Sequence, residues 1–134
     1  VDWMIRANIG NTIFFKRWIA GDSSVKRVLE IRNYRLKAGS RAIFHALVAE
    51  QSLPLHREWG MDVVNHGPSL HDPDVYFLMR AYDDLEELNR SQAAFYATEA
   101  WRRGPREAIV ELIESDANTV LWLPDVAIDA LRGC

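Results

Sequence analysis

The stretch R-V-L-E-I-R-N-Y, Arg27–Tyr34, decides the fold, because its side chains alternate between two unlike sets. Alternation with a period of two is the pattern of a β-strand whose faces meet different environments. One face is aliphatic, and the other carries a carboxylate, a guanidinium and a phenol: Glu30, Arg32 and Tyr34. A second stretch, V-Y-F-L-M-R-A-Y at Val75–Tyr82, alternates in the same way and also ends in R-x-Y. The chain therefore contains two related strands.

A helix and a further strand are predicted between these two strands. Ser40 is a plausible N-cap, Pro54 is expected to kink or restart the helix, and Gly60 is well placed to end it. The residues 62–66 form the next predicted strand. The short, turn-rich segment that follows them predicts an antiparallel hairpin with the strand at Val75–Tyr82.

The second half of the chain repeats the helix-to-strand order. The acidic segment at residues 83–87 predicts a capped helix that runs towards Trp101. Gly104 and Pro105 end it and begin another helix. The residues 118–123 form the fourth predicted strand, and the residues 125–131 form at most a short helix.

This order predicts an α+β, ferredoxin-like fold with a four-stranded antiparallel sheet and helices on one face. We expect the helices to cover the purely apolar face, which consists of Leu29, Ile31, Val75, Phe77, Met79 and Ala81. The opposite face is rich in aromatic residues and is too apolar to be left in water. We therefore expect two copies to pair as a dimeric α/β barrel. The alternative is a monomer in which the N-terminal extension covers that face.

Composition limits the classes of function. With 134 residues and a net charge of −3, the chain fits one domain, residues 26–134, preceded by an N-terminal extension, residues 1–25. No face rich in lysine and arginine is present, which argues against nucleic-acid binding. No apolar run reaches the roughly 18 residues of a membrane span. The single cysteine, Cys134, favours a reducing, cytoplasmic location.

Three segments in the right order resemble the NIPSNAP family. They are E-I-R-N-Y-R-L-K-A-G at residues 30–39, S-L-P-L-H-R-E-W-G at residues 52–60 and L-M-R-A-Y-D-D-L-E-E at residues 78–87. The resemblance covers about residues 27–124 and departs from the family at Ala38, where proline is common, and near Met79, where an aromatic residue is common. It implies the dimeric α/β-barrel superfamily, which also contains cofactor-independent monooxygenases, haem-degrading enzymes and small-molecule binders.

The face that carries charged and aromatic residues holds the candidate ligand site. Two guanidiniums among aromatic rings suit an anionic or carboxylate-bearing ligand. The alternative is that the carboxylate pairs with an arginine in a structural buried network. The candidate ligand-binding residues are Glu30, Arg32, Tyr34, His66, Arg80, Tyr82 and Trp122. Trp122 is included although alternation does not decide which face of the last strand it occupies.

The histidines give no metal site. His66 and His71 lie close in sequence to Asp72 and Asp74, but their spacing matches no metal motif and the segment reads as a hairpin loop. His66 remains a candidate acid or base at the edge of a pocket. On one continuous helix His45 and His56 would be about 16 Å apart, so we expect them on the surface rather than around one ion.

The sequence therefore predicts a homodimeric NIPSNAP-like protein that binds a small organic ligand and uses no cofactor. It identifies no catalytic residue. The alternatives are a non-catalytic dimeric module that recruits a protein partner, and a cofactor-independent monooxygenase or isomerase in which a tyrosine or histidine moves a proton.

Overall fold

The computed structural model describes residues 25–133. The predicted N-terminal extension, except for Val25, and Cys134 lie outside these residues.

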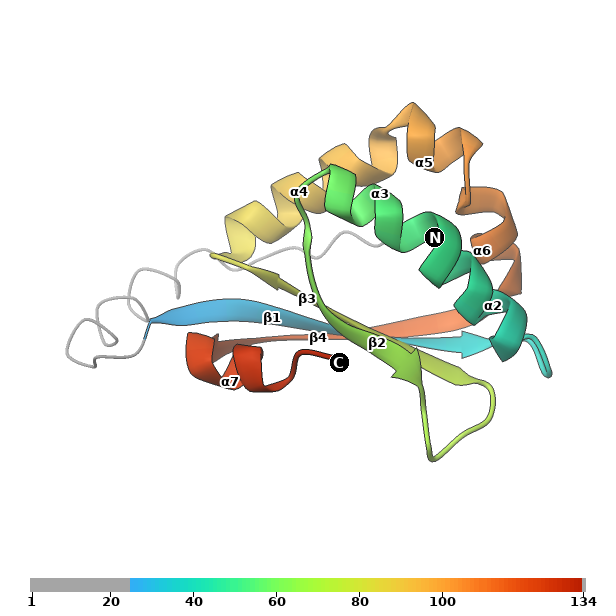
Figure 1. Ribbon diagram of the computed structural model, residues 1–134, viewed down its shortest axis with the longest axis horizontal. Coiled ribbons are helices and arrows are strands. Elements are labelled where there is room, and N and C mark those ends of the chain that lie inside the picture. The colour runs from blue at the N-terminus through green and yellow to red at the C-terminus, as the bar shows by residue number, and fades with distance from the viewer. Residues whose placement is uncertain (1–24, 134) are drawn as a thin grey trace.

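Four strands form one antiparallel sheet (Figure 1). They are β1 (Lys26–Leu36), β2 (Asp62–Pro68), β3 (Val75–Tyr82) and β4 (Ile113–Pro124), in the order β2-β3-β1-β4. The predicted ferredoxin-like sheet and the hairpin between β2 and β3 are confirmed. Strand β4 begins at Ile113 rather than at residue 118. Its first half is mostly polar and exposed, which is tolerated at a sheet edge. This half shows no alternation of apolar and polar residues, so the sequence pattern does not predict it as a strand.

Most helices lie over one face of the sheet (Figure 1). They are α2 (Arg41–Leu47), the π-helical η1 (Val48–Ser52), α3 (Leu53–Glu58), α4 (Leu85–Ala97), α5 (Glu99–Arg103) and α6 (Arg106–Leu112). The short helix α7 (Asp125–Ala130) lies on the opposite face, where Ile128 packs against Leu29 and Ala81.

Pro54 explains the π-helical turn between α2 and α3. Proline has no N–H, so the regular hydrogen-bond ladder is interrupted at this point. The N–H of Leu53 donates to the carbonyl of Val48, five residues back, which is the π-helical pattern. Gly60 follows α3 with φ = 69°, a conformation that glycine adopts without steric cost. The predicted effects of Pro54 and Gly60 are confirmed.

The predicted helix from residue 83 towards Trp101 is in fact two helices. Asp84 caps α4 by accepting a hydrogen bond from the N–H of Glu87, as the acidic segment predicts. Thr98 then adopts an extended backbone with ψ = 148°, and its hydroxyl accepts a hydrogen bond from the N–H of Trp101. The threonine ends α4 and caps α5 because its side chain satisfies a free N–H at the new helix start.

The prediction of which sheet face lies under the helices is wrong. The helices cover the face that carries Val28, Tyr34 and Tyr82, which pack with Phe44 and Phe95. This arrangement buries charged groups, which pair with one another and so offset part of the cost of removing them from water. The aliphatic face points away from helices α2–α6.

Among the described residues, that aliphatic face is only partly covered. Leu29 and Ala81 are buried near α7, whereas five large apolar side chains around them remain half-buried. These five are Ile31, Phe77, Met79, Leu121 and Leu123.

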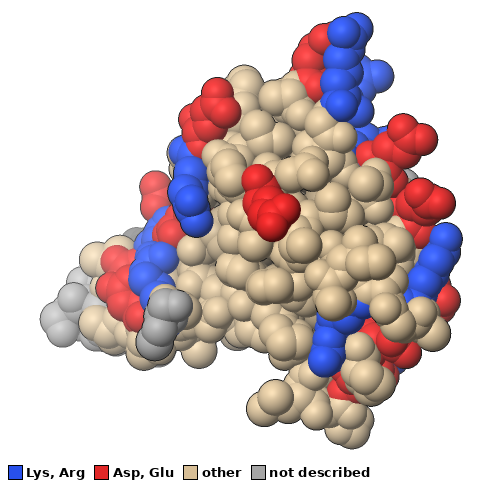
Figure 2. Space-filling model, turned by 45° about the vertical axis from the view of Figure 1, so that its right-hand side comes forward, with Lys and Arg blue, Asp and Glu red and all other residues tan. Residues whose placement is uncertain are grey.

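The outer surface of α2, η1 and α3 carries few charges. Between Arg41 and Arg57 the sequence contains one charged residue, Glu50. Figure 2, which brings the α2 side of the molecule forward, shows a broad area with a single acidic side chain near its middle and the other charged side chains at its margins. Ile43 on α2 and Trp59 after α3 are 61% and 51% exposed.

Candidate functional site

A buried carboxylate lies at the centre of the candidate site. Glu30 on β1 accepts hydrogen bonds from Arg80 Nε on β3 at 2.7 Å and from Arg32 Nη2 at 2.9 Å. The pairing of β1 with β3 sets Glu30 directly opposite Arg80. All three side chains are at most 1% exposed. Burial alone would raise the pKa of Glu30, but the charges of Arg80 and Arg32 outweigh it and lower the pKa from 4.5 to about 2.

Two amides complete the hydrogen bonds of this carboxylate. Gln92 on α4 and Asn118 on β4 donate to Glu30 Oε2 at 2.7 and 2.8 Å. The amide of Gln92 also donates to the hydroxyl of Tyr82 at 3.1 Å. Four donors from three strands and one helix therefore meet at a single carboxylate, which is the structural network foreseen as the alternative to a ligand site.

Arg80 extends from this network towards the helices. Its Nη1 donates to Tyr96 Oη at 2.7 Å and to His56 Nε2 at 3.1 Å. Its Nη2 is buried and has no hydrogen-bond partner among the described residues. A buried N–H that lacks an acceptor is costly, so an additional acceptor at this atom would be stabilising.

His56 is neutral and held in one orientation. Its Nδ1 donates to the carbonyl of Ser52 at 2.8 Å, which leaves Nε2 as the acceptor for Arg80. Burial lowers the pKa of His56 from 6.5 to about 3, and the charge of Arg80 contributes in the same direction. An imidazole with so low a pKa is a weak base at neutral pH, which argues against His56 as a general base.

A small cavity lies between the sheet and the helices, and its wall includes His56 and Tyr96, the two residues that bind Arg80 Nη1. Its volume is about 20 Å³, which is room for about one water molecule. Aromatic rings and His56 form most of its wall, which includes Tyr34, Phe44, Tyr76, Tyr96 and Trp101. The aromatic side chains therefore fill most of the space that a barrel interior would offer to a ligand.

The predicted site residues separate into three groups: the buried network, the cavity wall, and two residues that lie apart from Glu30. Glu30, Arg32, Arg80 and Tyr82 belong to the buried network, and Tyr34 lines the cavity. Burial raises the pKa of the Tyr34 phenol.

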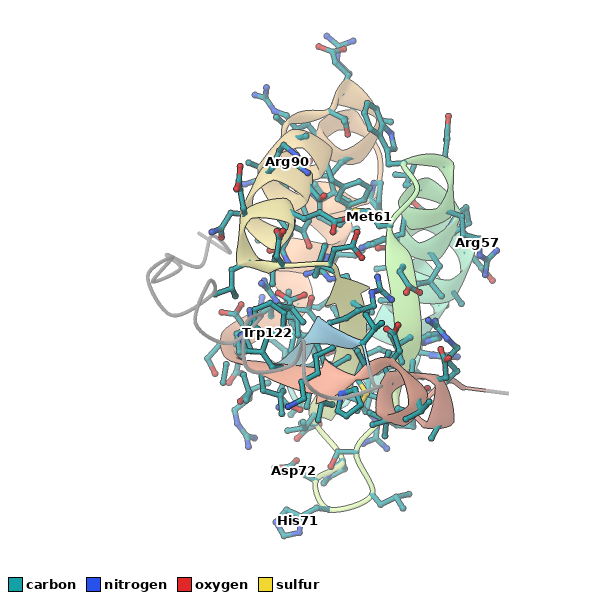
Figure 3. The ribbon with its side chains drawn as sticks, turned by 90° about the vertical axis from the view of Figure 1, so that its left-hand side faces the viewer. Arg57, Met61, His71, Asp72, Arg90 and Trp122 are labelled. Carbon is teal, nitrogen blue, oxygen red and sulfur yellow. The ribbon has the colours of Figure 1, made fainter. Side chains whose placement is uncertain are left out.

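Trp122 and His66 lie apart from Glu30. Trp122, labelled in Figure 3, stands opposite Val28 on the helix-facing side of β4 and packs against the core. His66 hydrogen-bonds through Nδ1 to the hydroxyl of Tyr76 at 2.8 Å, as does His45.

Four residues of the network escape the sequence pattern: His56, Gln92, Tyr96 and Asn118. The prediction that His56 lies on the surface is wrong, since it is 1% exposed, whereas His45 is exposed as expected. Gln92 leaves a signal, because it lies between Leu88 and Phe95 on the buried stripe of α4. A polar residue at such a position predicts a buried hydrogen-bond partner.

Residues 25–133 contain no group of three or more histidine, cysteine, aspartate or glutamate side chains that could hold a metal ion. No helix within these residues is long and apolar enough to cross a membrane.

Solved structures provide the comparison with known proteins. No protein-family model matches the sequence, and no curated protein matches it. A NIPSNAP family protein from Agrobacterium tumefaciens is 20% identical, with a TM-score of 0.66 over 71% of this chain and 90% of that one. A second from the same organism, of unknown function, is 22% identical, with a TM-score of 0.67 over 73% and 88%. The chain has the NIPSNAP fold. The resemblance indicated by the three sequence segments is confirmed.

The same fold extends beyond proteins with the NIPSNAP name. A candidate antibiotic biosynthesis monooxygenase from Nitrosomonas europaea is 18% identical, with a TM-score of 0.55 over 70% of this chain and 95% of that one. At such identities the likeness shows the NIPSNAP and ferredoxin-like fold alone.

We predict that Glu30→Gln destabilises the protein by about 3–5 kcal/mol, because it leaves the two buried guanidiniums without their shared carboxylate. Urea unfolding measures the change. The control is Asp72→Asn, which weakens the exposed ion pair with Arg35 and should change the stability much less. Equal losses in the two variants would contradict the central role of Glu30.

We predict a loss of stability in mild acid that depends on His56. Its pKa is lowered in the fold, so below pH 6.5 the unfolded chain binds a proton that the folded chain does not, and stability falls as the pH drops towards 3. The slope from this residue is at most about 1.4 kcal/mol per pH unit. Glu30 adds its own loss only below pH 4.5, where its pKa would lie in the unfolded chain.

Urea unfolding between pH 7 and pH 5 isolates the histidine contribution. His56→Gln should flatten the slope by up to one proton, because the variant lacks the buried imidazole. An unchanged slope in His56→Gln would show that this residue is not held neutral.

Proposed function

We propose that this NIPSNAP-like protein binds a small organic ligand between its sheet and its helices, with an anionic or carbonyl oxygen of the ligand against Arg80. The observation that carries the proposal is the buried Arg80 Nη2, which has no acceptor among the described residues. Its guanidinium is bound to His56 and Tyr96, which both line the aromatic cavity.

The charges of the network favour an acceptor that is negative. Arg32 and Arg80 are both buried, and Glu30 is the one buried carboxylate that pairs with them. Asp116, 3.6 Å from Arg32 Nη1, is partly exposed and compensates less. An anion at Arg80 would therefore meet a local excess of positive charge, and the surrounding rings would pack against the carbon skeleton of the ligand.

A ligand larger than water requires the aromatic wall to open. Tyr96 and Trp101 form part of that wall and stand on either side of Thr98, where α4 ends in an extended backbone. Their rings touch with centroids 5.2 Å apart, so they would move as one unit. We expect the opening at this joint, because α5 is only one short helix and changes its position at low cost.

We further propose that the functional unit is a homodimer built on the open sheet face. That face presents a continuous half-buried apolar surface, and α7 covers one part of it among the described residues. A second copy placed on it would bury the same residues on both chains, as a two-fold interface does. Such a pairing of two sheets gives the dimeric α/β barrel. We propose a cytoplasmic location from the single cysteine of the sequence.

A non-catalytic interaction module is the second candidate. A protein partner would bind the outer surface of α2 and α3, which carries few charges and exposes Ile43 and Trp59. The third candidate, a cofactor-independent monooxygenase or isomerase, is supported by the fold of the Nitrosomonas europaea protein and by tyrosines on the cavity wall. The low pKa of His56 leaves a tyrosine as its proton carrier.

Native mass spectrometry tests the ligand. We expect a mass above that of the chain in protein purified from cells, and its loss in Arg80→Met, because a charge-assisted hydrogen bond is worth about tenfold in affinity. Arg35→Met removes an exposed arginine and should retain the ligand. Circular dichroism confirms that both variants fold. A ligand that persists in folded Arg80→Met would refute the site.

Light scattering tests the dimer. We expect twice the mass of the 15.4 kDa chain, and we expect Ile31→Asp to give the monomer mass because it buries a charge in the proposed interface. The matched control is Ile43→Asp, which places the same charge on the outer surface of α2 and should leave the dimer intact. Dissociation by Ile43→Asp alone would place the interface on the helical layer instead.

A further inference from the structure

A second concave surface follows the outer edge of strand β2. It is a groove of about 500 Å³ between α3, β2 and Gly133, and this volume lies in the range of sites for small molecules. Leu53, Met61 and Val63 supply apolar surface, and Arg57 and His66 supply nitrogen donors. None of these residues belongs to the network around Glu30.

A β-bulge and a close backbone approach fix the shape of this groove. The register of β2 with β3 shifts between Val63 and Asn65. The side chain of Val64 packs with Ile128 of α7, in the cluster that also contains Leu29 and Ala81. Asn65 holds the C-terminal segment by donating to the carbonyl of Leu131 at 3.0 Å. A Cβ at Gly133 would lie 2.7 Å from Asn65 Oδ1, so a larger residue there would displace the Asn65 side chain.

The groove carries uncompensated positive charge. Arg57 makes no hydrogen bond or ion pair with the described residues, and Figure 3 shows it extending outward from α3. Asp62 also lines the groove, but Arg27 and Arg132 bind its carboxylate at 3.0 and 2.7 Å. The one acidic side chain of the groove is thus neutralised from outside it, which leaves Arg57 to attract an anion.

His66 is held with one nitrogen free for the groove. Its Nδ1 shares the hydroxyl of Tyr76 with Nδ1 of His45, each at 2.8 Å. The phenol has one proton, so it donates to one imidazole and accepts from the other. Nε2 of His66 makes no hydrogen bond with the described residues. The groups that face this ring are His45 from α2, Arg57 from α3 and Tyr76 from β3.

We propose that this groove is a second ligand site, which binds a small carboxylate with an apolar body. The carboxylate lies against Arg57 and His66 Nε2, and the apolar body lies on Leu53, Met61 and Val63. Burial, and then the nearby His45 and Arg57, lower the pKa of His66, so the ring is neutral near pH 7. A bound anion offsets these positive charges and therefore favours protonation of the ring. Binding therefore strengthens as the pH falls.

Hexanoate is the probe, and hexanol is its uncharged counterpart. Amide chemical shifts of the full chain, followed by NMR during titration at millimolar concentrations, should change for residues 63–66 with hexanoate and less with hexanol. Arg57→Gln should weaken hexanoate binding about fivefold. Affinity should rise between pH 8 and pH 6, where hexanoate stays ionised, in the wild type but not in His66→Gln.

Two control variants separate this site from the interior. Arg35→Gln removes an exposed arginine of another ion pair and should leave binding unchanged. Tyr34→Phe changes the wall of the interior cavity and keeps the ion pairs of Glu30, so it should also leave the changes at residues 63–66 unaffected. The groove and the interior site therefore fail or succeed independently. The proposal is overturned if residues 63–66 do not respond, if hexanol is equivalent to hexanoate, or if Arg57→Gln binds as the wild type does.

Discussion

The shared ion pairs of Glu30 with Arg32 and Arg80 are the interaction on which the rest of the structure depends. Charges removed from water cost several kcal/mol each unless their partners and remaining hydrogen bonds are supplied. The sheet supplies the three charges and one amide, and the helical layer supplies Gln92, His56 and Tyr96. The helices therefore pack on the charged face, because only there do their polar groups complete the network.

This choice of face has two consequences for function. The interior fills with paired side chains and rings, which leaves a cavity of about 20 Å³. The apolar face is left outside the helical layer, and among the described residues it is only partly covered, by α7. At the edge of the sheet, the bulge in β2 opens a larger groove whose charge is independent of the network.

Some members of the network can be found from the sequence and others cannot. Glu30, Arg32, Arg80 and Tyr82 lie on two alternating strands, so the pattern itself places them together. Asn118 meets Glu30 from 88 positions away, inside a polar stretch of an edge strand that shows no alternation. His56 points inward from α3, because the π-helical turn before Pro54 shifts which residues face the sheet. A helical periodicity extended from α2 therefore places His56 on the wrong side of the helix.

The sequence by itself determined the order of strands and helices, the hairpin, the restart at Pro54 and the end at Gly60, because each depends on local backbone chemistry. It also determined which residues share a face of β1 and β3, because side chains alternate along a strand. Only the tertiary structure decided which of those faces is buried. Alternation is the same for both faces, so it does not indicate which of them the helices cover. That choice depends on hydrogen bonds from helices that are distant in sequence and meet Glu30 and Arg80 only once the chain has folded.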